Sequence, residues 1–134
     1  MSAYRQMQTV IQDGDTLMKV LEKRFKTVER HASPQTLFDY HGLARPQKAE
    51  IIVRRKYVQS YANDLGYLKN DSGSYEAIVS EFDSGRFGQK FLDEITRDYQ
   101  EEKAKSLMEA NEATLEERVV NSDGSVRLRF YVNA

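Results

Sequence analysis

The chain has 134 residues, of which 40% are hydrophobic and 31% charged, with a formal net charge of −1, no cysteine and no tryptophan. Its apolar stretches are too short to cross a bilayer, its N-terminus lacks the apolar core of a signal peptide, and it can form neither disulfides nor thiolate sites. We therefore expect one cytoplasmic α+β domain spanning residues 1–134, without membrane contact, bound metal or cofactor.

The first two thirds of the chain predict a strand, a short helix and a series of further strands. Asp13-Gly14-Asp15 breaks the first strand and offers an N-cap, and Leu17 and Leu21 then follow at helical spacing. Ser33-Pro34 predicts a turn, because proline disfavours helix at the preceding residue, and residues 70–73 predict a hairpin loop. Strands are expected at Tyr4–Ile11, Phe25–Arg30, Thr36–Tyr40, Ala49–Arg54, Tyr61–Leu68 and Ser74–Phe82.

The last third predicts a loop at Ser84–Gly88, a long helix at Gln89–Ala110 and a closing hairpin. Asp123-Gly124 is a two-residue turn signal, and apolar residues then alternate with Arg127 and Arg129. The order of elements predicts a single, mostly antiparallel sheet with one short and one long helix packed on one face. The buried stripe of the long helix should comprise Phe91, Leu92, Ile95 and Tyr99, continued less strictly by Leu107.

Charge is unevenly distributed, since residues 45–56 are basic and residues 91–117 are acidic. Such asymmetry is typical of partner surfaces, although two solvated faces would produce the same pattern. Opposite patches that meet across a subunit contact would favour a homo-oligomer, most simply a two-fold dimer. We therefore expect a homo-oligomer, with a second protein as a further candidate partner.

Basic residues on the closing hairpin form the first candidate ligand site. Guanidinium groups bind phosphate and a tyrosine ring can stack on a base, which suits a small anionic ligand, a nucleotide or RNA. Glu116 and Glu117 could instead neutralise the arginines across the hairpin. A net charge of −1 disfavours broad nucleic-acid binding. The candidates are Arg118, Arg127, Arg129 and Tyr131 on the hairpin, with Arg54 and Arg55 as a second cluster.

Two weaker patterns concern catalysis and metal binding. Asp39 and His41 are two residues apart, so they would face one side of a strand and could form the acid–base pair of a hydrolase. No serine or cysteine nucleophile stands in a recognised motif. Carboxylates at helical spacing along the long helix could hold a hard cation, but that helix has no histidine, and ion pairs such as Glu101–Lys105 are the default.

Several short segments, taken in order, resemble those of one family. They are Tyr40-His41-Gly42, Ala49–Val53, Asp64–Tyr67, Gly73–Val79, Phe91–Tyr99 and Asp123–Leu128. Through them the chain resembles the small uncharacterised proteins of cyanobacteria and chloroplasts described as a conserved open reading frame, a domain of unknown function also found in bacteria and phages. The family has no assigned reaction, so the resemblance implies no catalytic residue. The chain has Ser2-Ala3-Tyr4 where family members commonly begin Ser-His-Phe.

These patterns favour a non-enzymatic binding or interaction protein that acts through oligomer assembly and sequestration of a partner or ligand. The first alternative is a nucleotide- or RNA-binding protein that uses the basic face of the hairpin. The second alternative is a hydrolase that uses the Asp39–His41 pair.

Overall fold

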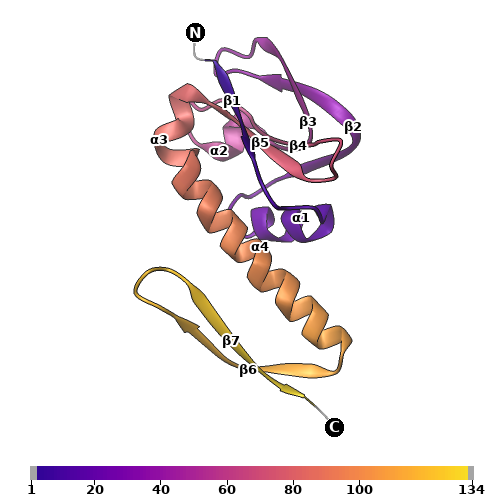
Figure 1. The fold of residues 1–134 in the computed structure, drawn as a ribbon. Coiled ribbons are helices and arrows are strands. Elements are labelled where there is room, and N and C mark those ends of the chain that lie inside the picture. The colour runs from indigo at the N-terminus through magenta and orange to yellow at the C-terminus, as the bar shows by residue number, and fades with distance from the viewer. Residues whose placement is uncertain (1–2, 133–134) are drawn as a thin grey trace.

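The computed structural model describes residues 3–132, so Ser2 lies outside the described part, and it shows an α+β fold, as predicted. A five-stranded sheet has two helices on one face, and a two-stranded hairpin lies against the longer helix (Figure 1). The elements are β1 (Tyr4–Gln8), α1 (Gly14–Glu22), β2 (Glu29–Phe38), β3 (Ala44–Val53), α2 (Arg55–Val58), β4 (Leu65–Lys69), β5 (Tyr75–Ser80), the 3₁₀ turn η1 (Glu81–Asp83), α3 (Ser84–Phe87), α4 (Gln89–Ala110), β6 (Ala113–Val120) and β7 (Val126–Val132).

The five-stranded sheet has the strand order β1-β5-β4-β3-β2, and its neighbouring strands are all antiparallel. The loop at residues 70–73 joins β4 to β5, and Asn70 Oδ1 accepts hydrogen bonds from the backbone of Ser72 and Ser74, as the turn formers predict. The register sets Ile51, Tyr67 and Ala77 side by side on the helix-covered face. Alternation along the strands thus directs one set of apolar side chains into the main core.

The short helix α1 begins where the sequence predicts. Asp13 is its N-cap, and Asp13 Oδ1 accepts from the Asp15 N–H at 3.0 Å. Lys103 Nζ lies 2.7 Å from Asp13 Oδ2, and this hydrogen bond lowers the pKa of Asp13 to about 2. Leu17 and Leu21 are fully buried against the sheet. One carboxylate therefore both caps α1 and ties it to α4.

The long helix α4 has the predicted bounds and presents Leu92, Ile95 and Tyr99 to the core. The Tyr99 hydroxyl accepts from the Asp13 N–H at 3.0 Å, which anchors α4 to the start of α1. The predicted continuation of the stripe to Leu107 is wrong, because Leu107 is exposed. No helix among the described residues is long and apolar enough to span a membrane.

The second face of the sheet carries a smaller apolar cluster, which is formed by residues of the sheet's own strands. Leu37 of β2 packs there with Ala49 and Ile78. The close packing of Leu37 and Ala49 depends on Gly66, since a Cβ at that position would lie 2.9 Å from Ala49 Cβ and 3.0 Å from Leu37 Cδ1. The expected turn at Ser33-Pro34 is wrong, because β2 continues through both residues with a register shift. Proline is accommodated because β2 is an edge strand.

Three further sequence expectations differ from the structure. The strand expected from Phe25 starts later, because the Phe25 N–H still bonds to the Leu21 carbonyl as α1 ends. The strand expected from Tyr61 starts at Leu65, after a turn. The loop expected at Ser84–Gly88 is largely the short helix α3, which follows η1 directly. A local turn thus delays the start of two strands, and a short helix replaces the expected loop.

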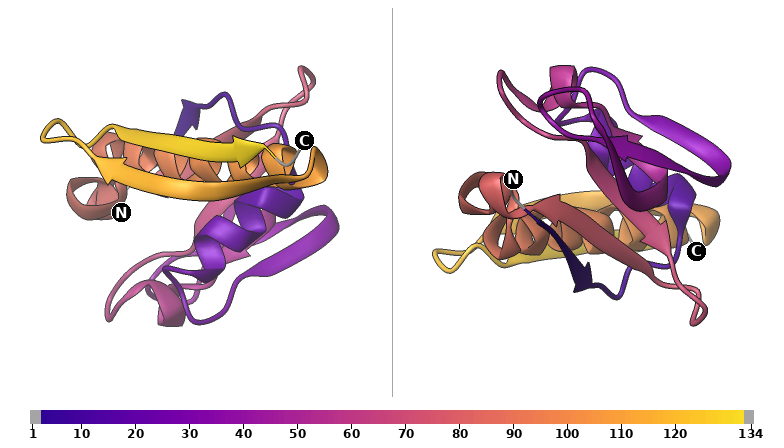
Figure 2. Two further views of the ribbon diagram at one scale, coloured as in Figure 1. Left: turned by 90° about the horizontal axis from the view of Figure 1, so that it is seen from below. Right: turned by 90° about the horizontal axis from the view of Figure 1, so that it is seen from above.

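The closing hairpin is not part of the five-stranded sheet. β6 and β7 pair only with each other, and both views in Figure 2 show them lying along α4. The 22 residues of α4 carry the chain about 33 Å, well past the edges of the sheet. The expectation of one sheet thus holds for the first five strands, whereas the hairpin forms a second, small sheet.

Candidate functional site

Asn63 and Asp64, which we call the Asn63–Asp64 pair, organise the polar surface at the start of β4. Both side chains are buried, with 3% and 1% of their surface exposed. Asp64 Oδ2 accepts from the Phe38 N–H at 2.8 Å and from Arg54 Nη1 at 2.9 Å, and Asp64 Oδ1 accepts from the Arg55 N–H at 2.7 Å. One buried carboxylate therefore links the end of β2 to the start of α2.

Asn63 holds two exposed aromatic residues in the same way. Asn63 Oδ1 accepts from the Tyr40 N–H at 2.9 Å, while Asn63 N and Nδ2 donate to Asp83 Oδ2 at 3.0 and 3.1 Å. Asp83 follows Phe82 in the chain. The rings of Tyr40 and Phe82 are stacked, with centroids 6.0 Å apart and planes inclined by 19°.

A hollow of about 440 Å³ lies beside the Asn63–Asp64 pair. Gly42 is part of its rim, with φ of +79°, a conformation that L side chains rarely adopt. Asp39 Oδ1 stabilises the same loop by accepting from the N–H groups of His41 and Leu43. The hollow is lined by Phe38, Gly42, Arg54, Arg55, Lys56 and Asp64.

The basic residues around the hollow differ in how far they are neutralised. Burial opposes the charge on Arg54, but hydrogen bonds to Glu29 and Asp64 outweigh it and raise the pKa of Arg54. Arg55 Nη1 donates to the Tyr40 carbonyl at 2.9 Å, and Lys56 Nζ lies 4.9 Å from the ring centre of Tyr57. Within residues 3–132, Arg55 and Lys56 make no ion pair. These two cations therefore carry the net positive charge of the hollow.

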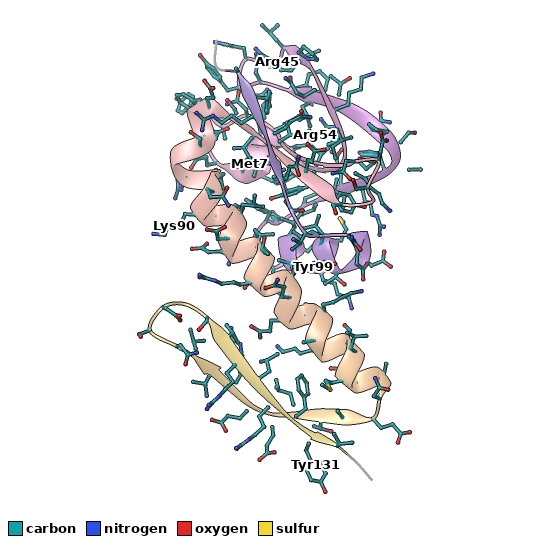
Figure 3. All side chains as sticks on the ribbon, in the orientation of Figure 1. Met7, Arg45, Arg54, Lys90, Tyr99 and Tyr131 are labelled. Atoms are coloured by element: carbon teal, nitrogen blue, oxygen red, sulfur yellow. The ribbon has the colours of Figure 1, made fainter. Side chains whose placement is uncertain are left out.

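The structure does not bring the predicted hairpin residues together on one face. Arg118 lies opposite Leu128, on the side that faces α4, and it binds Glu101 there at 2.6 Å. Whether Arg118 joins Arg127 and Arg129 depended on the hairpin register, and the register places Arg118 on the other face. Figure 3 shows Tyr131 at the hairpin end of the molecule, far from Arg54.

On the outer face of the hairpin, neighbouring glutamates neutralise one of the two arginines. Arg129 Nη2 lies 2.7 Å from Glu117 and 3.4 Å from Glu116, as the structural interpretation predicts. Arg127 has no ion pair within the described residues. The hairpin thus offers one unpaired guanidinium, and the hollow offers two cations beside aromatic rings.

The expected acid–base pair of Asp39 and His41 does not form. The two residues lie in a turn rather than on one strand, and Asp39 Oδ1 is occupied by the loop backbone. The His41 ring lies against the Tyr40 ring instead, with centroids 3.9 Å apart. The carboxylates at helical spacing on α4 have basic partners, as in the predicted Glu101–Lys105 pair at 3.0 Å; the others are Glu94, Asp98 and Glu102.

Sequence reasoning identified Arg54 and Arg55 but missed the residues that position them. The only local signal for the Asn63–Asp64 pair was two adjacent polar side chains directly before an apolar strand. Turn-forming residues of this kind are usually solvated, so the signal did not separate a buried anchor from an ordinary turn.

Comparison with known proteins places the chain in a family. Searches of curated proteins and of solved structures found no match. A family model described as "Protein of unknown function (DUF1257)" matches residues 22–129, which include the Asn63–Asp64 pair and most of the hairpin. This match confirms the predicted membership of an uncharacterised conserved family. The chain therefore belongs to the DUF1257 family of proteins of unknown function.

Proposed function

We propose that this protein is a non-enzymatic binding protein that takes an anionic ligand in the hollow beside Arg55 and Lys56. The observation that carries the proposal is the contrast between neighbouring cations. Arg54 is neutralised by Glu29 and Asp64, whereas Arg55 and Lys56 have no acidic partner within the described residues. Charge-assisted hydrogen bonds from such groups to phosphate oxygens are stronger than neutral ones.

The local framework supports this proposal because it limits the motion of the site. The Arg55 backbone is bound to the buried Asp64 carboxylate, and its guanidinium is bound to the Tyr40 carbonyl. An arginine that is already oriented loses less conformational freedom when it binds a ligand. We also propose a cytoplasmic location, with which the absence of cysteine from the sequence agrees.

Titration calorimetry with inorganic tripolyphosphate tests the proposal. We expect the wild type to bind with an affinity that falls as salt rises, and the Arg55→Ala/Lys56→Ala variant to lose binding. The control is Lys19→Ala/Lys90→Ala, which removes the same charge at exposed positions that do not line the hollow. Equal binding by both variants would refute a role for the hollow.

A second proposal, assembly into a homo-oligomer, is supported by the hairpin. β6 and β7 form an isolated two-stranded sheet, and both strands have an outer edge with no partner strand among residues 3–132. Val120 and Val132 are exposed beside these edges. Unpaired edges with apolar side chains are templates for pairing with another chain. A monomer mass of 15.5 kDa in sedimentation equilibrium would reject assembly.

A further inference from the structure

Tyr40, two residues before the Gly42 that lines the hollow, stacks with Phe82 to form an aromatic surface. Their side chains are large, and 41% and 60% of the two residues' surface is exposed. The second ring lies within stacking distance of the first, so they form one patch rather than two isolated residues. Exposed apolar patches beside polar groups are typical of binding surfaces.

Buried polar groups hold this surface in place. Asn63 and Asp83 are 3% and 2% exposed, and their mutual hydrogen bonds lie beneath the loops that carry Tyr40 and Phe82. Ser80 Oγ also accepts from the Phe82 N–H. Burying an amide and a carboxylate is unfavourable unless they are hydrogen-bonded. Since Asn63 also accepts from the Tyr40 N–H, the two aromatic segments are linked through its side chain. The rings are therefore presented by a rigid frame.

The aromatic surface and the cations of the hollow are joined to each other. The Arg55 guanidinium donates to the backbone carbonyl of Tyr40, so this cation contacts the residue that carries one of the two rings. An inorganic anion would use the cations and leave the rings in water. A ligand with both a phosphate and a flat aromatic ring would use both sets.

We infer that the ligand is a phosphorylated nucleoside unit, whose phosphate binds Arg55 and Lys56 and whose base stacks on the exposed ring of Phe82. This inference rests on the proposed function of the hollow and names its ligand class. Base stacking on aromatic side chains combined with a few cations is the usual mode for single strands and tolerates different bases. Among the described residues that line the hollow, two cations have no acidic partner, fewer than the many phosphate contacts that duplex binding requires.

Fluorescence anisotropy with a labelled single strand of about ten nucleotides tests this inference. Unlabelled mononucleotide and tripolyphosphate serve as competitors. We expect Phe82→Ala to weaken strand binding about tenfold or more, because a stacked base is lost, and to leave tripolyphosphate binding unchanged. Leu107→Ala is the matched control, because Leu107 is similarly exposed, at 58%, but lies on α4 and does not line the hollow. It should bind like the wild type.

The outcomes separate this inference from the proposed function. Competition by mononucleotide as well as by unlabelled strand would identify a free nucleotide as a sufficient ligand, and competition by strand alone would identify single-stranded nucleic acid. If tripolyphosphate binds but Phe82→Ala leaves strand binding unchanged, the inference fails and the proposed function stands. If neither tripolyphosphate nor any nucleotide binds, both fail, and the aromatic surface is left for a protein partner.

Discussion

Replacing Asp64 by Asn should destabilise the domain far more than a conservative change of one atom suggests. The carboxylate is 1% exposed and accepts three hydrogen bonds, two at Oδ2 and one at Oδ1. The amide of asparagine keeps one acceptor oxygen and adds an N–H₂ donor. Whichever way the amide is turned, its N–H₂ group faces at least one backbone or guanidinium donor, and the charge partner of Arg54 is lost.

The size of the effect follows from these contacts. Removing one partner of a buried ion pair costs about 3–5 kcal/mol. Arg54 keeps its bond to Glu29 at 3.0 Å, so the low end applies, and we expect a loss of about 3 kcal/mol. That is a large part of the roughly 5–15 kcal/mol that stabilises a typical domain. Glu29→Gln removes the other carboxylate of the same arginine, but that side chain is 33% exposed, and we expect a loss of about 1 kcal/mol or less.

Urea denaturation of the wild type and both variants, followed by circular dichroism, measures these differences. The slope of the unfolding free energy with urea should stay the same in all three proteins, so that the midpoints report stability alone. If Asp64→Asn is no less stable than Glu29→Gln, the Asn63–Asp64 pair does not organise the site as described. Folded Asp64→Asn protein should also bind tripolyphosphate more weakly, because the Asp64 carboxylate that anchors the Arg55 backbone is lost.

Three further predictions concern other parts of the molecule. Ile95→Asp should unfold the domain by burying an unpaired charge, whereas Leu107→Asp, on the exposed end of α4, should change stability by about 0.5 kcal/mol or less; circular dichroism distinguishes them. The pKa of Asp13 is lowered from 3.8 to about 2, so its stabilisation is nearly complete above about pH 4 and is lost as the pH falls through 2. The difference in unfolding free energy between wild type and Asp13→Asn should be about 1 kcal/mol at pH 6 and should vanish below about pH 2; a difference independent of pH would contradict this. The Arg127→Ala/Arg129→Ala variant should lose less than about 1 kcal/mol of unfolding free energy and should bind tripolyphosphate like the wild type, because glutamates already neutralise Arg129. Weaker binding in the same calorimetric titration would show that the hairpin takes part in ligand binding.

Elements with strong local signals were predicted well from the sequence. The bounds of α4 follow from the spacing of Leu92, Ile95 and Tyr99, and the start of α1 follows from the capping side chain of Asp13. The turn at Asp123-Gly124 likewise lies where the two residue types favour it. Each of these signals lies within a few neighbouring residues, where helix periodicity, caps and turn propensities act.

The candidate site depends on contacts between distant parts of the chain. Asn63 meets Asp83 and Asp64 meets Phe38, partners 20 and 26 residues apart, and no local pattern distinguishes such buried anchors from solvated turn residues. The hairpin register sets which residues share a face with Arg118, and only the packing of the hairpin on α4 turns that face toward Glu101. The sequence by itself determined α1, α4, the turn of the closing hairpin and the α+β class, because propensity and periodicity are local. Only the tertiary structure decided which charges are neutralised and which remain free, because that depends on long-range packing.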